Sequence, residues 1–397
     1  MADLSRRHLL RLGGRSATGL ALAALAGTGA YRSFASGHGG ALEATRQGRQ
    51  VTDRPVRIGY LPITDASALL GAYELGLLAA GGVPAARPIL FRSWDAMAQA
   101  LTTNQVDVVH MPMPMALALR AGQRAPIKVL CWGHTNGSAL TVRPDITDVR
   151  HLAGTTVAIP FWWSIHNILL QRLLVDAGLT PLTGGTPSSS AGTVALTVMA
   201  PSDMVPALAA RSISAFVVAD PFSAVAEAQR VGRVHRFLGD VWRRHACCAI
   251  TASEAFVSAE PEAAGAVVTA VVQAQQWFSA HRPQAGALIT TRGRFLPQAP
   301  AAVSTVFTRQ ASGYAATSEH PDWHGEQLGF EAFPARSYTE RLVDLMHETK
   351  ALGDTSFLTG LTGRDAHDEL VDARFVTQSL RAVGAAVTAN RQELIEP

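Results

Sequence analysis

Short apolar runs alternate with amphipathic segments of helical length along most of the chain. The runs predict strands, and the segments with apolar positions three and four residues apart predict helices. The predicted strands are 56–62, 88–91, 106–110, 127–132, 155–160, 193–198 and 215–219. The predicted helices are 66–78, 94–101 with Ser93 as its N-cap, 114–121, 164–177, 202–210, one that opens at Pro221, 263–280 and 338–350. Strands that alternate with helices predict an α/β fold with parallel sheets covered by helices on both faces.

The alternation of strands and helices restarts after Arg143, which indicates two α/β lobes. Without its N-terminal leader the chain keeps about 360 residues, more than one hydrophobic core usually holds. We expect the first lobe to comprise 55–138 and 256–397 and the second lobe 139–255, joined near 138–143, because the C-terminal helices suit a return to the first lobe. The Pro-, Gly- and Ser-rich stretch 181–192 predicts a loop in the second lobe.

The N-terminal residues have the pattern of a twin-arginine export signal. Arg6 and Arg7 precede an apolar stretch at 18–30. That stretch is shorter than the roughly 20 residues that span a bilayer, so it predicts a cleaved signal rather than an anchor. We expect a signal peptide at 1–35, a flexible leader at 36–54 and a periplasmic protein. A chance arginine pair in an amphipathic helix is the alternative.

Composition narrows the class of protein. Hydrophobic residues make up 48% of the chain and charged residues 16%, as in packed globular proteins. The net charge is +3 and the basic residues are scattered, so we expect no nucleic-acid partner. Cys131, Cys247 and Cys248 are odd in number, and adjacent cysteines rarely bridge each other. At least one thiol is therefore expected to be free.

Motifs of the common enzyme classes are missing. The chain has no Gly-x-Ser-x-Gly elbow, no phosphate-binding loop, no dinucleotide-binding glycine motif and no His-Glu-x-x-His. His320 and His324 are four residues apart, but Pro321 lies between them and favours a loop over a metal site. These absences predict no catalytic residue, no metal site and no cofactor.

Polar and aromatic residues gather directly after predicted strands. The segments are 62–65, 93–94, 110–115, 134–138, 161–167 and 220–222. In open parallel sheets, ligands bind beyond the carboxyl ends of the strands, where helix N-termini also converge. We therefore expect these segments to line one ligand cleft. Core packing, contacts between lobes and helix capping are the competing explanations for each of them.

Taken in order, these motifs resemble the nitrate- and bicarbonate-type solute-binding proteins of ABC importers, within the broader nitrate/sulfonate/taurine group. The matching motifs are 58–65, 93–94, 106–111 with Pro114, 135–137, 166–167, 220–221 and 274–277. The resemblance implies the type II periplasmic binding fold, in which a small ligand is trapped between two α/β lobes joined by two crossings. It also implies an ABC permease in the cytoplasmic membrane as partner. A monomer is expected.

The resemblance also assigns residues to the ligand. In that family, a tryptophan after serine, a polar residue before Asn-Gly and a histidine before Asn or Asp contact the anion, and Trp94, Thr135 and His166 stand at these positions. The family's charge-neutralising lysine corresponds to Cys248. A thiol of ordinary pKa supplies no positive charge, so we expect a neutral or soft ligand rather than nitrate. The family's Gly-Glu-Pro-Trp run is also altered, at 219–222.

The strand-end segments and the family positions together give the expected ligand-binding residues. These are Thr64, Asp65, Trp94, His110, Thr135, Ser164, His166, Asp220, Cys247 and Cys248. Two other functions stay open, namely a ligand sensor and a periplasmic enzyme with Cys248 as nucleophile and His245 or His166 as base. A thiol-lined or metal-chelate site near Cys131 and His134 is conceivable, although burial as a small hydrophobe is the simpler role for Cys131.

Overall fold

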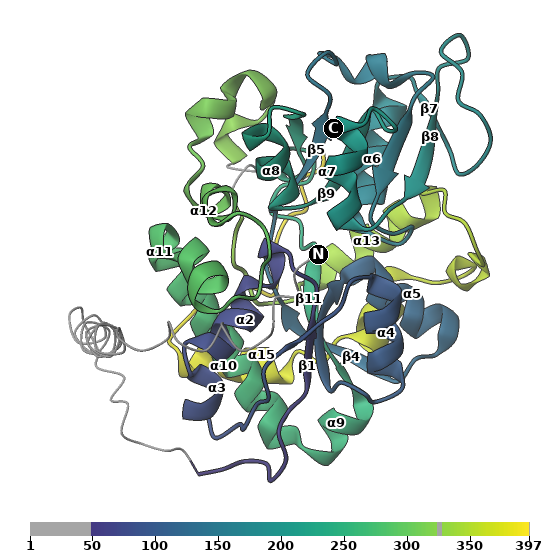
Figure 1. The fold of residues 1–397 in the computed structure, drawn as a ribbon. Coiled ribbons are helices and arrows are strands. Elements are labelled where there is room, and N and C mark those ends of the chain that lie inside the picture. The colour runs from purple at the N-terminus through teal and green to yellow at the C-terminus, as the bar shows by residue number, and fades with distance from the viewer. Residues whose placement is uncertain (1–48, 324–327, 397) are drawn as a thin grey trace, which may run out of the picture. The chain divides into compact units, whose positions relative to one another are not determined.

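The computed structural model describes residues 49–323 and 328–396. The predicted signal peptide at 1–35, residues 36–48 of the predicted leader and His324 lie outside the described residues. Residues Gln47–Pro397 form one compact unit, which contains two β-sheets (Figure 1). Among the described residues, no helix combines the length and apolar character required to cross a bilayer.

The first sheet has five strands and is mixed rather than parallel. β1 pairs in parallel with β2 and β3, whereas β11 pairs antiparallel with both β3 and β4. The strand order is β2 (Ile89–Leu90), β1 (Ile58–Tyr60), β3 (Val108–Pro112), β11 (Cys248–Ser253) and β4 (Ile127–Trp132). The predicted boundary at 255/256 put β11 in the second lobe. Its position in the first sheet follows from pairing with β3 and β4. Local sequence patterns do not reveal this pairing, because the two strands are remote in sequence.

Helices cover the first sheet from several parts of the chain. Ser93 caps α4 as predicted, because its side-chain oxygen accepts a hydrogen bond from the backbone N–H of Ala96 at 3.2 Å. The predicted helix 66–78 is divided at Gly76, whose φ of +74° is left-handed. The helices of this part are α2 (Ser67–Glu74), α3 (Leu77–Ala80), α4 (Trp94–Thr102), α5 (Met113–Gln123), α9 (Glu254–Ala259), α10 (Pro261–Ala280), α14 (Gly363–Leu370) and α15 (Arg374–Ala382). Helix α10 packs on α2 and α15.

The second sheet has six strands and is also mixed. β6 pairs in parallel with β8 and β9, and β5 pairs antiparallel with β9 and β10. The order is β10 (Arg233–Phe237), β5 (Ser138–Val142), β9 (Ala215–Ala219), β6 (Thr156–Ile159), β8 (Thr193–Val198) and β7 (Thr180–Leu182). Its helices include α6 (Ile165–Asp176), α7 (Pro201–Ala209) and α8 (Phe222–Ala228). The predicted joining segment 138–143 is therefore mostly a strand, and the predicted loop 181–192 begins inside β7.

Two connections carry the chain between the sheets, from β4 to β5 and from β10 to β11. The first turns at Asn136 and Gly137, with φ angles of 57° and 83°. A Cβ on Gly137 would lie 2.5 Å from Cδ1 of Leu328, so only glycine fits this turn. The second connection brings the cysteine pair to the start of β11. Polar residues of both connections are therefore held near each other by backbone geometry.

The remaining C-terminal helices contact more than the first sheet. They are α11 (Arg282–Ala287), α12 (Pro300–Thr308) and α13 (Arg336–Glu348). Helix α12 packs on α8 of the second sheet, and the backbone carbonyl of Lys350, just after α13, accepts a hydrogen bond from Gln171 of α6 at 2.7 Å. These helices were expected to return to the first lobe, and α12 and the end of α13 also contact helices of the second sheet.

Candidate functional site

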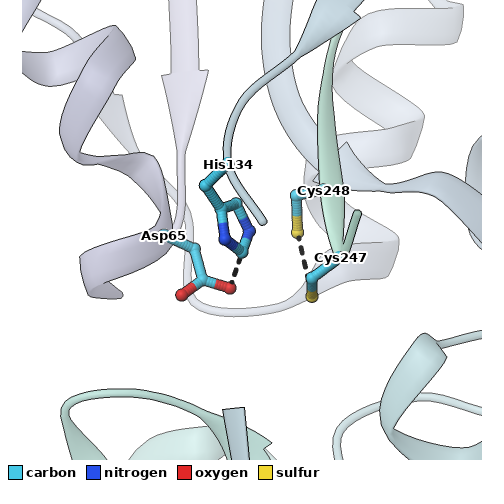
Figure 2. Close-up of side chains that lie close together, drawn as sticks. All are labelled: Asp65, His134, Cys247 and Cys248. Atoms are coloured by element: carbon cyan, nitrogen blue, oxygen red, sulfur yellow. Dashed lines mark hydrogen bonds and ion pairs between the residues drawn. The ribbon is translucent and has the colours of Figure 1, made fainter. Parts of the chain in front are cut away.

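Four side chains with metal-ligating or acid–base chemistry converge beyond the strand ends (Figure 2). Asp65 lies in the 3₁₀ turn Thr64–Ala66 after β1, and His134 follows β4. Cys247 and Cys248 lie where the second connection enters β11. All four are buried, and their ligand atoms lie within 4.8 Å of one another.

Asp65 and His134 form a fully buried ion pair. Nε2 of His134 lies 3.0 Å from Oδ2 of Asp65. Burial alone would disfavour the charged imidazolium, but the carboxyl group of Asp65 raises the pKa of His134 to about 10. Burial raises the pKa of Asp65 to about 7, against the opposing effect of His134. The pair therefore holds at least one proton at neutral pH.

The pKa values of the two adjacent thiols are shifted in opposite directions. Their sulfur atoms lie 3.7 Å apart, and both cysteines are free. Burial opposes the Cys247 thiolate, yet hydrogen bonding from the Cys248 thiol and the nearby His166 lower the pKa of Cys247. Burial and the neighbouring Cys247 raise the pKa of Cys248. Cys247 is thus the group that ionises first, and Cys248 remains a neutral thiol.

His166 joins this cluster from α6, one of the helices of the second sheet. Its Nε2 atom lies 3.9 Å from Sγ of Cys247 and 2.9 Å from Oγ of Ser138. Its Nδ1 atom is buried and has no hydrogen-bond partner among the described residues. His166 follows Ser164, whose hydroxyl caps α6 by accepting from the N–H of Asn167 at 3.2 Å. The helix start therefore fixes the histidine beside the thiols.

His110 is a second buried histidine at the centre. Its ring lies 5.5 Å from the ring of His134, and both of its nitrogens lack a hydrogen-bond partner in the described part of the chain. Burial lowers the pKa of His110 to about 3, so the ring is neutral. The close approach of the ring depends on Gly133, because a Cβ there would lie 2.6 Å from Cδ2 of His110.

Asp220 and Thr64 connect the two sheets rather than present free polar groups. The hydroxyl and the N–H of Thr64 both donate to the backbone carbonyl of Asp220 at 2.9 Å. The Asp220 carboxylate accepts hydrogen bonds from Arg309 and Ser223. The polar atoms of Asp220 named here are therefore already occupied.

Thr135 exchanges two backbone hydrogen bonds with Gly329, at 2.9 and 2.8 Å.

Trp94 and Cys131 are both buried, and neither belongs to the four-residue cluster. Trp94 opens α4, and its Nε1 atom has no hydrogen-bond partner in the described part of the chain. Cys131 lies within β4 in the apolar core, and burial raises its pKa. Its simpler predicted role, a small buried hydrophobe, agrees with this environment.

The structure thus brings together most of the predicted residues and adds two. Asp65, His110, His166, Cys247 and Cys248 form one cluster, with Thr64 and Asp220 beside it through a backbone link. The additions are Ser138 and His134, which the sequence offered only for a conceivable thiol-lined or metal-chelate site. Both lie in the strand-end segment 134–138, so the polar composition of that segment was a usable signal.

The enzyme alternative named Cys248 as nucleophile and His245 or His166 as base. Nδ1 of His245 faces the carbonyl of Trp242 at 3.0 Å. Burial lowers the pKa of His245 to about 4, and the raised pKa of Cys248 makes it a poor nucleophile. The Cys247 sulfur lies 3.9 Å from Nε2 of His166.

The chain thus has two mixed β-sheets joined by two connections, with a buried polar centre beside them. Residues 49–291 match the NMT1-like family, and the chain belongs to this family. The nitrate/nitrite binding protein NrtA of Synechococcus elongatus is 25% identical over 309 residues, which cover 70% of this chain and 67% of that protein. The matches cover 52–67% of the lengths of three NrtA proteins.

Solved structures agree on the fold. The periplasmic nitrate-binding protein NrtA from Synechocystis gives a TM-score of 0.68 at 18% identity, covering 83% of this chain and 89% of that one. The zinc-bound ligand-binding component of an ABC-type import system from Staphylococcus aureus gives 0.64 at 18% identity, covering 82% and 99%. These comparisons confirm the predicted periplasmic binding fold and the resemblance to nitrate/sulfonate-type solute-binding proteins.

Proposed function

We propose that the protein is the extracytoplasmic solute-binding subunit of an ABC importer. The observation that carries this proposal is the buried polar centre, to which both sheets contribute, most directly through His166 and Cys247. A solute held there touches groups of both sheets, so its binding favours the state in which they are close together. Capture by hinge closure is the mechanism that follows.

The partner we propose is a membrane permease with its ATPase. The nitrate import ATP-binding protein NrtC of Synechocystis contains a region 26% identical to this chain over 243 residues, which supports an import system. The chain itself acts as a monomer in this proposal. A ligand sensor on the same fold would share the binding step but not the permease, and stimulation of the permease-bound ATPase by the loaded protein distinguishes the two.

The solute we propose is small and is not nitrate. Cys248 stands where the resembling proteins have a charge-neutralising lysine, and it is a neutral buried thiol. The chain's only lysines do not replace that charge, because the amino group of Lys128 donates to the carbonyl of Glu369 and that of Lys350 to the carbonyl of Pro181. A buried nitrate would therefore lack the lysine that balances its charge in that family.

We expect Trp94→Phe and His166→Ala each to weaken solute binding at least tenfold, about 1.4 kcal/mol. Each change removes a buried nitrogen that has no hydrogen-bond partner among the described residues and can bond to a solute. The solute is first found by melting shifts against small anions including nitrate, ureas, nitriles, sulfonates and metal complexes, since saturating ligand stabilises the folded state. Titration calorimetry then measures the affinity of each variant.

Trp163→Phe is the matched control for Trp94→Phe. Trp163 is also buried, and its ring packs edge-on against Phe357 at 5.6 Å. We expect the affinity of Trp163→Phe for the solute to stay within twofold of that of the parent protein. Unchanged affinity in both Trp94→Phe and His166→Ala would show that the solute binds elsewhere.

We also propose export through the twin-arginine pathway, on the basis of Arg6 and Arg7. Replacing both by lysine is expected to leave the precursor in the cytoplasm, because the pathway reads the arginine pair. Cell fractionation and immunoblotting measure the distribution, with Arg11→Lys as the control. Normal periplasmic levels of the double variant would refute this route.

A further inference from the structure

The four buried side chains of Figure 2 form a donor set for a metal ion, in the same buried centre where we propose that the solute binds. They supply one carboxylate oxygen, one imidazole nitrogen and two sulfur atoms from three segments far apart in the sequence. We propose that Asp65, His134, Cys247 and Cys248 bind one divalent transition-metal ion of the zinc class. The proposal concerns binding alone and does not depend on a permease.

Distances within each half of the set, the two sulfur atoms and the Asp65–His134 pair, suit tetrahedral coordination. Two thiolates on one tetrahedral zinc, each at about 2.3 Å, lie about 3.8 Å apart, and the two sulfur atoms here are 3.7 Å apart. Oxygen and nitrogen ligands at about 2.0–2.1 Å lie about 3.3 Å apart, and the Asp65–His134 separation is 3.0 Å. The largest separation in the set is at most 4.8 Å, so an ion requires a contraction of about 1 Å between the two halves.

Unpartnered atoms at the same place are the second observation. Oδ1 of Asp65 and Nδ1 of His134 are buried and have no hydrogen-bond partner among the described residues. Buried polar atoms without partners are costly, and a protein interior rarely keeps several of them at one point. A bound cation compensates this cost, because carboxylate, imidazole and thiolate are all its ligands.

The donor types select the class of metal. Magnesium and calcium prefer oxygen ligands throughout, which two sulfur atoms do not provide. A mixed nitrogen, oxygen and sulfur set of four favours zinc and its neighbours in the transition series. His166 and His110 lie just outside the set and can support it, since Nε2 of His166 is 3.9 Å from Sγ of Cys247.

The test uses the full chain, reduced, stripped of metal and purified without a polyhistidine tag. Zn²⁺ is titrated against a chromophoric chelator, and Co²⁺ serves as an optical probe because thiolate ligands give it a sulfur-to-cobalt charge-transfer band. We expect one ion per chain and that band in the parent protein. Cys247→Ser, Cys248→Ser and His134→Gln should each weaken Zn²⁺ binding at least 100-fold, and the two cysteine variants should reduce the band.

Cys131→Ala is the matched control, since Cys131 is a buried thiol outside the donor set. This variant should still bind one ion per chain and show the sulfur-to-cobalt charge-transfer band. Circular dichroism verifies that each variant is folded, and the parent protein's Co²⁺ spectrum decides the matter even if a variant does not fold. A parent spectrum without the charge-transfer band, or a band that survives in Cys247→Ser and Cys248→Ser, would overturn the proposal. Neither result would bear on delivery to a permease, which the ATPase assay measures separately.

Discussion

Replacing Arg309 by methionine is expected to lower the free energy of unfolding by about 3–5 kcal/mol. The side chains of Arg309 and Asp220 are each only 1% exposed. Nη2 of Arg309 donates to the Asp220 carboxylate at 3.1 Å and to the hydroxyl of Ser223 at 2.8 Å. Burial disfavours the guanidinium charge, but the Asp220 carboxylate raises the pKa of Arg309. Removing the arginine therefore leaves a buried carboxylate without its counter-charge.

Urea denaturation followed by circular dichroism measures this loss. Arg150→Met is the matched control, because Arg150 pairs with Asp148 at the surface and such pairs contribute little to stability. Adding Asp220→Asn to Arg309→Met should restore part of the loss, since the uncompensated charge is then absent. Equal denaturation midpoints for Arg309→Met and Arg150→Met would show that the buried pair does not stabilise the fold.

The stability of this pair also matters for the site. Arg309 follows α12, whereas Asp220 ends the β9 segment of the second sheet, and the carbonyl of Asp220 accepts two hydrogen bonds from Thr64. Thr64 immediately precedes Asp65 of the buried cluster. The ion pair therefore helps to hold the segments of Arg309, Asp220 and Thr64 together beside the proposed binding centre.

Local sequence predicted the elements that local forces determine. The strands 127–132, 193–198 and 215–219 have the predicted bounds, because each is a short segment rich in apolar residues. The start of α4 was predicted from Ser93, whose hydroxyl satisfies a backbone donor that the helix itself leaves free.

Sheet membership depended on contacts that local sequence does not encode. β11 and β5 pair antiparallel with strands from other parts of the chain, without a preceding helix to signal a βαβ unit. A strand's periodicity reports how much of it is buried but not which sheet buries it. For that reason the residues of β11, which pairs in the first sheet, were placed in the predicted second lobe, and the segment that forms β5 was expected to be a connection.

For the site, the sequence predicted the neighbourhood better than the individual side chains. The family resemblance pointed to Thr135, but its neighbour His134 makes the buried pair with Asp65. The left-handed turn at Asn136 and Gly137 influences which of these two side chains faces the buried cluster. The sequence motif does not specify these φ angles. Ser164 was predicted to bind the ligand, and its hydroxyl caps α6, because a serine after a strand can cap a helix as readily as it can bind a ligand.

Truncation of Tyr338 to alanine is expected to cost about 3–5 kcal/mol of unfolding free energy, as for other large buried aromatics. The ring is fully buried, stacks on Trp242 at 4.6 Å and meets the edge of Trp132 at 5.1 Å. Its hydroxyl donates to the backbone carbonyl of Ala246, the residue before Cys247. The same change should therefore loosen the cysteine pair as well as leave a cavity.

Tyr338→Phe separates these two effects, because it keeps the ring and removes only the hydroxyl. It leaves the Ala246 carbonyl without this donor, and we expect a loss of about 1–3 kcal/mol. Labelling with a thiol reagent under native conditions reports the second effect, since Cys247 and Cys248 are buried and react only when the region opens. Labelling should be fastest in Tyr338→Ala, intermediate in Tyr338→Phe and slowest in the parent protein. If Tyr338→Ala lowered stability while labelling of the two cysteines stayed at the parent rate, the hydroxyl contact would not be what holds the thiols in place.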